Sequence, residues 1–311
     1  MGRNRIDIII PTYKPNEELA ELIHRLQKQT ITPNKIILMN TEESLIQPFL
    51  EKSRILEQYG NIELHHISLR EFDHGKTRHE GVQYSQAPFF LCMTQDALPA
   101  DEKMVEELMD MLVKEKVAAA YARQLPRKGS SILEEYTRGF NYPEESRVKS
   151  QTDIKELGIK AYFCSNVCAA YNRQTYDLLG GFLRKTIFNE DMIYAAKAIQ
   201  QGYQIVYQAR ARVIHSHSYT GWQQFTRNFD LGVSQADHPE IFDHVPSEKE
   251  GKKLIKGMAG FLWRERKIWW MFPFIYESGC KLIGYRLGKN YKKLPKGLIR
   301  VCSMNQNYWD F

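Results

Sequence analysis

The sequence lacks a long hydrophobic run. Its longest apolar stretch covers residues 268–276 and includes Pro273, whereas a helix needs about 20 apolar residues to cross a bilayer. The first residues lead directly into a short strand-like segment, without the apolar core of a secretory signal. We therefore expect a cytoplasmic protein, and the 43% hydrophobic and 26% charged composition is that of an ordinary globular chain.

Cysteine is scarce and odd in number. The five cysteines lie mostly in apolar runs, which favours reduced, buried thiols over a disulfide framework. Cys164 and Cys168 lie on one predicted strand, and no second Cys/His pair completes a zinc site around them. We expect no metal role for these thiols.

An excess of positive charge is absent from most of the chain. The net charge is +6, but residues 252–300 hold thirteen Lys and Arg against only Glu265 and Glu277, so the rest of the chain is net acidic. A nucleic-acid-binding protein would carry basic residues along its main groove, so we expect no nucleic-acid partner.

The basic segment is also rich in aromatic residues, which sets it apart from the rest. We predict a main domain over residues 1–245 and a basic, aromatic, helical extension over residues 246–311. Such a composition is typical of an element that lies on an anionic membrane surface. The alternative is a helical cap that packs its tryptophans on the main domain. These aromatic residues are Trp263, Trp269, Trp270, Phe272, Phe274 and Tyr276.

The remaining chain alternates between strand and helix patterns. Short apolar runs at residues 5–10, 35–39, 62–67, 89–93 and 117–121 predict strands. Helical patterns separate them, with Asn16 and Asp101 as caps and single helices over residues 43–59 and 76–85. This alternation predicts an α/β fold with a mostly parallel sheet and right-handed crossovers.

Regular patterning weakens after residue 123. We expect a long excursion or lid over residues 123–160, a strand over 161–171, and a strand pair within 204–214. A helix should end before Gly180, and Asn189, Glu190 and Asp191 should open another.

Polar residues follow three of the predicted strands, where open α/β folds bind their ligands. The clusters should lie along one edge of the sheet, in a row long enough for a nucleotide. Asp96 is the one isolated acid directly after the fourth strand, which makes it the first candidate for a site residue. The alternative is that Asp96 only starts a turn or caps a helix. The clusters contain Pro11, Thr12 and Tyr13; Asn40 and Glu42; and Thr94, Gln95 and Asp96.

A fourth polar cluster opens the helix after the third strand. Gly75 would allow a close backbone approach, and the helix N-terminus would favour an anion. Lys76 or Arg78 could pair with a phosphate. The alternative is a solvated helix start with a convenient glycine.

Five short motifs are spread along the chain: Ile8-Ile9-Ile10-Pro11-Thr12-Tyr13, Thr94-Gln95-Asp96, Gly180-Gly181-Phe182, Asn189-Glu190-Asp191 and Val213-Ile214-His215. They stand in the order and spacing of family 2 glycosyltransferases of the GT-A fold, which the chain resembles over residues 5–235. More narrowly, the segments 72–78, 94–97 and 215–219 look like the bacterial rhamnosyltransferase branch that builds surface polysaccharide.

The resemblance implies a donor and metal site at the sheet edge. Pro11, Thr12 and Tyr13 would lie under the nucleotide of a dTDP- or UDP-sugar, with Asn40 and Glu42 at its polar edge. Residues 94–96 correspond to the Asp-x-Asp motif that holds a divalent ion, and this chain keeps only the last acid. His215 or His217 resembles the distal metal ligand. An imidazole beside a carboxylate accepts Mn²⁺ as well as Mg²⁺.

The resemblance also implies an acceptor side and an inverting reaction. Asp191 would be the base that takes the proton of the attacking hydroxyl, and Glu190 and Asn166 would orient the acceptor. We expect transfer of a sugar, plausibly L-rhamnose from dTDP-L-rhamnose, to a cell-surface or polyprenyl-linked glycan at the inner face of the membrane.

Other classes of function make different demands on the sequence. A catalytically silent scaffold of the same fold is conceivable because Thr94 replaces an acid, but Asp96, Asp191 and His215 together argue against it. A nucleotidyltransferase would need a glycine-rich loop with lysine after the first strand, and residues 11–14 lack the glycines. Nucleic-acid binding through the basic segment would require a steep dependence of affinity on salt.

Overall fold

The described strands form one nine-stranded sheet. This computed structural model describes residues 5–217, 219–245 and 248–309. Predicted features at Met1–Asn4, Ser218 and Pro246 lie outside these ranges. The strands are β1 (Ile6–Tyr13), β2 (Lys35–Thr41), β3 (Ile62–Ile67), β4 (Phe89–Met93), β5 (Leu98–Pro99), β6 (Val117–Leu125), β7 (Arg147–Lys149), β8 (Cys168–Asn172) and β9 (Gln204–Ile214).

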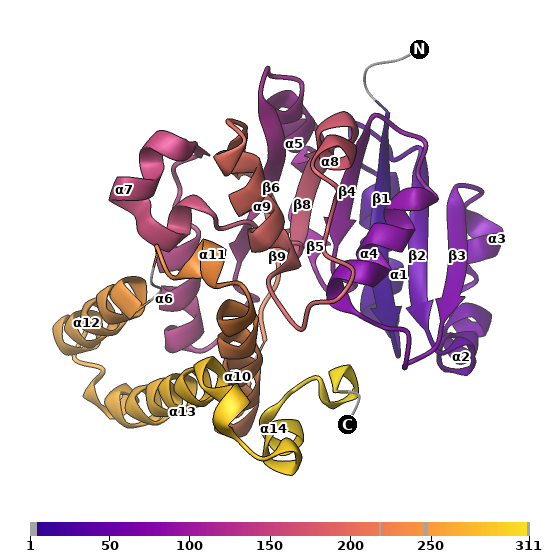
Figure 1. Cartoon of the computed structure of the whole chain (residues 1–311). Helices are drawn as coiled ribbons and strands as arrows, with labels where there is room; N and C mark the ends of the chain where they lie inside the picture. Colours follow the sequence, from indigo (N-terminus) through magenta and orange to yellow (C-terminus); the bar gives the residue numbers. More distant parts are fainter. Residues whose placement is uncertain (1–4, 218, 246–247, 310–311) are drawn as a thin grey trace.

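The strand order is β3-β2-β1-β4-β8-β6-β9-β5, and β7 pairs with β9 (Figure 1). Parallel pairing joins β3, β2, β1 and β4, as the alternation predicts. Beyond β4 the sheet is mixed, because β8 runs antiparallel to both β4 and β6 while β6 is parallel to β9. The predicted α/β class is confirmed, with a parallel half and a mixed half.

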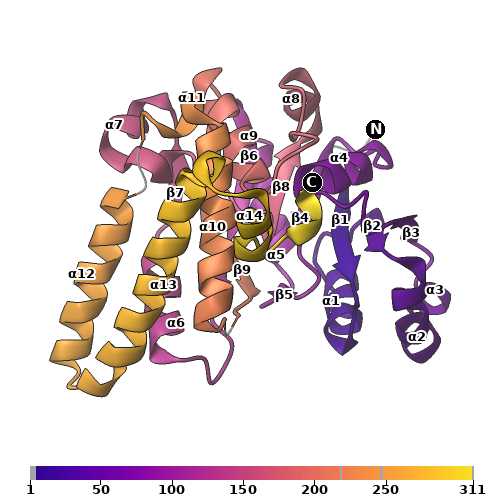
Figure 2. The same cartoon turned by 60° about the horizontal axis from the view of Figure 1, so that its bottom comes forward.

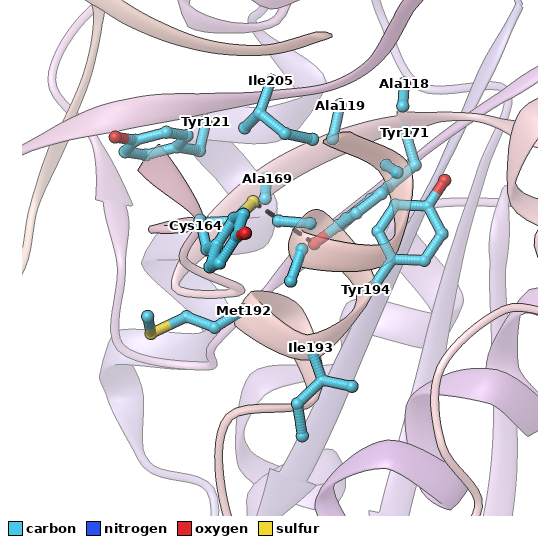
Figure 3. Close-up of a cluster of buried hydrophobic side chains, with 14 of the residues drawn as sticks. Ala118, Ala119, Tyr121, Cys164, Ala169, Tyr171, Met192, Ile193, Tyr194 and Ile205 are labelled. Atoms are coloured by element: carbon cyan, nitrogen blue, oxygen red, sulfur yellow. Dashed lines mark hydrogen bonds between the residues drawn. The ribbon is translucent and has the colours of Figure 1, made fainter. Parts of the chain in front are cut away.

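Helices cover both faces of the sheet. Along β1, Ile6, Ile8 and Ile10 pack on one side and Ile9 on the other, all fully buried, as the period of two in a strand requires. Tyr171 of β8 and Tyr194 lie in the core of the second face (Figure 3). The first face is covered by α1 (Glu17–Gln27), α2 (Glu43–Ser53), α3 (Ile55–Gln58) and α5 (Met104–Leu112), the second by α4 (His74–Gln83), α8 (Arg173–Leu178) and α9 (Glu190–Gln200).

Most predicted helix boundaries are confirmed, and two are wrong. Asn16 caps α1 by accepting from Glu18 N at 3.0 Å. The single helix expected over residues 43–59 is two, because Arg54 between α2 and α3 adopts a left-handed conformation with φ 52°. Asp101 accepts from Lys103 N in a turn, so α5 starts only at Met104, without a side-chain cap.

The segment expected as an excursion over residues 123–160 is largely ordered. It contains α6 (Ile132–Asn141), η1 (Gln151–Asp153), α7 (Ile154–Leu157) and η2 (Gly158–Ala161), and its strand β7 pairs with β9. The strand expected over 161–171 is the shorter β8, so Cys164 lies before it. The strand pair expected within 204–214 is the single strand β9.

The C-terminal segment is helical, as predicted. In Figures 1 and 2, α13 lies along α10, and α12 and α13 project away from the parallel half of the sheet. Within the described ranges, every helix falls short of the length and apolar character that a bilayer crossing requires. The elements are α10 (Gly221–Asp237), α11 (Pro239–Phe242), α12 (Glu248–Arg264), η3 (Ile268–Trp270), α13 (Met271–Lys289), η4 (Tyr291–Lys293), α14 (Lys296–Cys302) and η5 (Gln306–Tyr308).

Candidate active site

The predicted polar clusters lie together at one edge of the sheet. Register places Thr12 of β1 beside Asn40 of β2, and Thr12 Oγ1 donates to Asn40 Oδ1 at 3.3 Å. Gln95, after β4, accepts from Tyr13 N and donates to Tyr13 O, both at 3.0 Å. Pro11 stands one residue earlier on β1, opposite Met39. The strand ends therefore form the continuous row that the sequence predicts.

Asn40 and Glu42 help to shape this edge. Asn40 Nδ2 donates to Glu42 O at 3.0 Å, and Glu42 Oε1 accepts from Leu69 N at 2.5 Å. Glu42 adopts a left-handed backbone with φ 64°, which is uncommon outside glycine and marks a constrained turn. Both side chains hold the loop after β2, and their contact with a nucleotide stays a prediction.

Asp96, His215 and His217 meet at the adjacent end of the row. Nε2 of His215 lies 3.5 Å and Nε2 of His217 lies 3.3 Å from Asp96 Oδ2. Among the described residues these three are the one cluster of His, Cys, Asp or Glu arranged to hold a metal ion, with ligand atoms within 4.8 Å of one another. One carboxylate and two imidazoles form a donor set that suits a divalent transition ion.

Gln124 orients the first imidazole. Arg138 donates to Gln124 Oε1, and Gln124 Nε2 donates to Ser165 Oγ at 3.0 Å, so the amide oxygen faces His215. His215 Nδ1 lies 3.2 Å from that oxygen and is therefore the protonated nitrogen. The lone pair of Nε2 is left to face Asp96, which is the orientation that metal-binding histidines require.

The electrostatics of the cluster favour an ionised carboxylate and a neutral imidazole. Burial raises the pKa of Asp96, but the interactions of the carboxylate with His215 and His217 outweigh it, so the pKa lies well below its usual range. Burial and the neighbouring His215 lower the pKa of His217 to about 4. Both groups are thus in the state that binds a cation at neutral pH.

Asp191 lies at the start of α9 and is held by backbone amides. Its Oδ2 accepts from Asn166 N at 2.8 Å, and its Oδ1 accepts from Met192 N at 2.7 Å. Burial, followed by the negative charge of Glu190, raises the pKa of Asp191 to about 7. A carboxylate with such a pKa accepts protons well at neutral pH.

Glu190 is part of a buried ion pair. Its Oε1 lies 3.2 Å from Arg78 Nη1, with both side chains less than a tenth exposed, and accepts from Asn166 Nδ2 at 3.0 Å. Burial raises the pKa of Glu190, but the positive charge of Arg78 outweighs it and the pKa is lowered. The acid pair is therefore split into an ionised Glu190 and a proton-accepting Asp191.

The fourth polar cluster has protein partners. Asp73 caps α4 by accepting from Gly75 N at 2.8 Å and Lys76 N at 3.0 Å. A Cβ on Gly75 would lie 1.9 Å from Leu183 O, so its close approach is to protein backbone, and Lys76 Nζ lies 3.7 Å from Glu80. Their assignment to the donor, like that of Arg78, stays a prediction.

A loop held by α10 presents the acid pair. Ser234 Oγ donates to Phe188 O at 2.8 Å and accepts from Asn189 Nδ2 at 3.1 Å. Ile187 is buried with Phe229 of α10 and Ile299 of α14. The C-terminal helices thus hold the loop from which Glu190 and Asp191 start.

One cleft of about 420 Å³ connects these groups. Its walls include Asn166, Glu190 and Asp191 together with His215 and His217. Sequence reasoning missed several cleft residues, because no local pattern shows that the segment expected as an excursion, or the later helices α10 and α13, reach the cleft. Arg227, for example, lies over the Phe188 ring at 4.6 Å. The missed residues include Gln124, Arg138, Tyr219, Arg227 and Lys281.

The fold, the cleft and the sequence together define a glycosyltransferase of the GT-A fold. Residues 7–180 match the family described as Glycosyl transferase family 2, and the chain belongs to that family. It is 37% identical over 306 residues to the O-antigen chain rhamnosyltransferase WbaN of Salmonella anatum, covering 97% of this chain and 95% of that protein. It is 36% identical over 308 residues to RfbN of Salmonella typhimurium, another O-antigen chain rhamnosyltransferase, covering 98% and 96%.

Solved structures of glycosyltransferases share the fold. The mannosyltransferase PcManGT of Pyrobaculum calidifontis, in complex with GDP-Man and Mn²⁺, has a TM-score of 0.62 at 14% identity, over 93% of this chain and 88% of that chain. TarS of S. aureus, residues 1–349, has a TM-score of 0.51 at 13% identity, over 93% and 91%. The GT-A fold expected from the motifs is thereby confirmed.

Proposed function

We propose that this chain transfers L-rhamnose from dTDP-L-rhamnose to a hydroxyl of a growing O-antigen glycan carried on a polyprenyl diphosphate. The near full-length similarity to two O-antigen rhamnosyltransferases supports the sugar and the product class. The single structural observation that carries the chemistry is the cleft that joins Asp191 to His215 and His217, which face Asp96.

The residues of the cleft have different roles in the proposed reaction. Asp191 receives the proton of the attacking acceptor hydroxyl, since its raised pKa gives it the basicity for that step at neutral pH. Glu190 stays ionised beside Arg78 and fixes Asn166, whose backbone amide in turn orients Asp191. Attack from the face opposite the leaving diphosphate gives inversion at the anomeric carbon.

Asp96, His215 and His217 would hold Mn²⁺ or Mg²⁺. Such an ion supplies positive charge that stabilises the departing diphosphate. Thr94 replaces the first acid of the Asp-x-Asp pattern, and the second imidazole provides the further ligand atom. The row of Pro11, Thr12, Tyr13 and Gln95 would receive the nucleoside at the same edge.

Contact with the inner membrane surface would bring the lipid-linked acceptor to the cleft. Trp263, Trp269 and Phe272 are at least 70% exposed and lie among the basic residues of α12 and α13. Aromatic side chains with flanking cations are typical of proteins that dock on anionic headgroups. The cleft side of α13 carries Lys281, which lines the active site.

A donor screen with the purified chain tests the proposal. In the presence of Mn²⁺, we expect release of dTDP from dTDP-L-rhamnose, and transfer to a lipid-linked acceptor with a product of opposite anomeric configuration, observed by NMR. UDP-sugars and GDP-mannose are the comparison donors. Faster turnover of one of these donors would overturn the rhamnosyl assignment, and retention of configuration would overturn the role of Asp191.

A further inference from the structure

A second cleft of about 680 Å³ lies next to the active site. It is formed where α6, β7 and the segment from α7 to η2 face α12. Four aromatic rings line it: Tyr121, Phe140, Phe163 and Tyr207. Tyr121 and Tyr207 are buried, whereas Phe140 and Phe163 are half-buried. Lys160 Nζ lies over the Phe140 ring, 4.0 Å from its centre. The volume lies in the range of pockets that bind small ligands.

The two clefts share a wall. Asn141 and Phe163 line both of them. Asn141 ends α6 and is exposed. Asn141 and Phe163 therefore form the border between the cleft that contains Asp191 and the second cleft.

The charges that line the second cleft are balanced. Lys160 lies 3.1 Å and Lys253 lies 2.6 Å from Glu250, and Arg147 lies 2.9 Å from Glu156. The four acids are Glu144, Glu145, Glu156 and Glu250, and the four bases are Arg147, Lys149, Lys160 and Lys253.

The buried base of this set is occupied with protein oxygens. Lys149 Nζ donates to Tyr121 OH at 3.2 Å and to Lys160 O at 3.3 Å. Burial lowers the pKa of Lys149 to about 7, so a large share of this side chain is uncharged at neutral pH. Lys160, Lys253 and Arg147 are paired with acids, and Glu144 lies 3.0 Å from Arg123. This cleft therefore suits a neutral ligand better than a phosphate.

We propose that the second cleft binds neutral sugar residues of the acceptor glycan that precede the one to be glycosylated. Pyranose rings present C–H surfaces that pack on aromatic faces such as those of Phe140 and Phe163. Their hydroxyls can donate to the Glu144 and Glu145 carboxylates and to the Asn141 amide oxygen. The inference rests on the proposed function, because it assigns the cleft to the acceptor of that reaction.

Saturation-transfer NMR on the full-length chain tests this binding directly. The probes are methyl glycosides of neutral hexoses and 6-deoxyhexoses, as monosaccharides and disaccharides. We expect ring-proton signals, stronger for disaccharides, that fall at least several-fold in Phe140→Ala and in Asn141→Ala. Asn141 is exposed, so its variant retains the fold even if Phe140→Ala lowers Tm. Tyr84→Ala, which removes an exposed aromatic ring at the C-terminal end of α4 and outside both clefts, should leave the signals unchanged.

Three outcomes would overturn the proposal. They are the absence of ring-proton signals, signals insensitive to both Phe140→Ala and Asn141→Ala, and displacement of the glycosides by uridine or by farnesol, which would assign the cleft to a base or a prenyl chain. Hydrolysis of dTDP-L-rhamnose by the unaltered chain is measured in parallel. If the unaltered chain does not hydrolyse dTDP-L-rhamnose but still binds glycosides in a way that depends on Phe140, the proposed donor is refuted and the glycan site stands.

Discussion

Asp191 is the residue on which the proposed chemistry depends most directly. Burial and Glu190 raise its pKa to about 7, and only the ionised form accepts a proton. We therefore expect kcat/KM for transfer to rise with pH up to about 7 and then to level, measured with lipid-linked acceptor at saturating Mn²⁺. Asp191→Asn should lower kcat by about 10²–10⁴-fold, the usual contribution of a general base.

The control for this substitution is Asp110→Asn, an exposed acid on α5, which should leave kcat unchanged. If Asp191→Asn retained full activity, another group would have to take the proton. The asparagine amide cannot titrate, so any residual activity should also lose the pH dependence near 7.

Gln124 tests the metal site without altering a ligand. Its amide oxygen accepts a hydrogen bond from His215 Nδ1, and this leaves His215 Nε2 to face the metal site. Gln124→Ala should weaken Mn²⁺ affinity by about 10–100-fold, the usual effect of losing a group that orients a metal-binding histidine. Calorimetric titration of the chelator-treated protein with Mn²⁺ measures the change, and Gln83→Ala on the exposed face of α4 serves as the control. An unchanged Mn²⁺ affinity would contradict the role of His215 as a metal ligand.

At the scale of elements, the contact between α10 and α13 depends on glycine. A Cβ on Gly288 would lie 2.1 Å from Phe229 O, and one on Gly284 would lie 2.2 Å from Phe225 O. The two helix backbones therefore pack closer than alanine would allow. This contact holds α10, whose Ser234 anchors the loop before the acid pair.

Gly288→Ala should consequently destabilise the protein by about 1–3 kcal/mol, the typical cost of overpacking, and lower transfer activity. Urea unfolding and the transfer assay measure the two effects. Gly279→Ala on the same helix meets nothing within 4 Å and should raise stability by up to about 1 kcal/mol through helix propensity. Equal effects of the two substitutions would disprove the close packing.

Asp230 of α10 anchors the segment after α14. Its carboxylate accepts from Ser303 Oγ at 2.7 Å and from Met304 N and Asn305 N at 3.0 Å each. Burial raises its pKa to about 7, despite these hydrogen bonds. Between pH 4 and 7 the folded chain therefore binds a proton at this position that the unfolded chain has released.

The free energy of unfolding should thus carry a contribution from Asp230 that is complete at low pH and is lost as pH rises to about 7. In Asp230→Asn this contribution is absent, so the decline of stability over that range should be shallower. Urea unfolding at pH 4.5, 6 and 7.5 measures both slopes. Parallel slopes would show that Asp230 keeps an ordinary pKa.

At the scale of the whole molecule, the hairpin of α12 and α13 carries an exposed apolar surface. Along α13, Phe272, Ile275, Tyr276 and Ile283 are each more than half exposed, at spacings that place them on one helical face. Arg264, Arg266 and Lys267 precede this face in the sequence, at the end of α12 and in the connection to α13.

We expect the chain to bind vesicles containing phosphatidylglycerol and to bind neutral vesicles weakly. Replacing Trp269 and Phe272 together with serine should reduce this binding at least tenfold in a sedimentation assay, and raised salt should weaken it through screening. Leu178→Ser, on exposed α8, is the control. Retention of binding by the double variant would favour the alternative of a helical cap without membrane contact.

Much of the molecule could be predicted from local patterns. The alternation of strands and helices, the cap at Asn16, and the position of Asp96 after a buried strand follow from periodicity and from the preferences of single residues. The segment over residues 123–160 could not be predicted in this way. Its strand β7 is three residues long and exists because β9, more than 50 residues later, pairs with it.

The sequence by itself determined the ends of the first four strands and the starts of α1 and α9, and with them the placement of Asp96 and Asp191, because hydrophobic periodicity and helix-start signals are local. Only the tertiary structure decided which distant groups meet. His215 and His217 face one oxygen of Asp96, Arg78 neutralises Glu190, and Gln124 orients His215. Such contacts depend on strand order and helix packing, which bring together residues that are about 90 to 120 positions apart in the chain and are not encoded in any single segment.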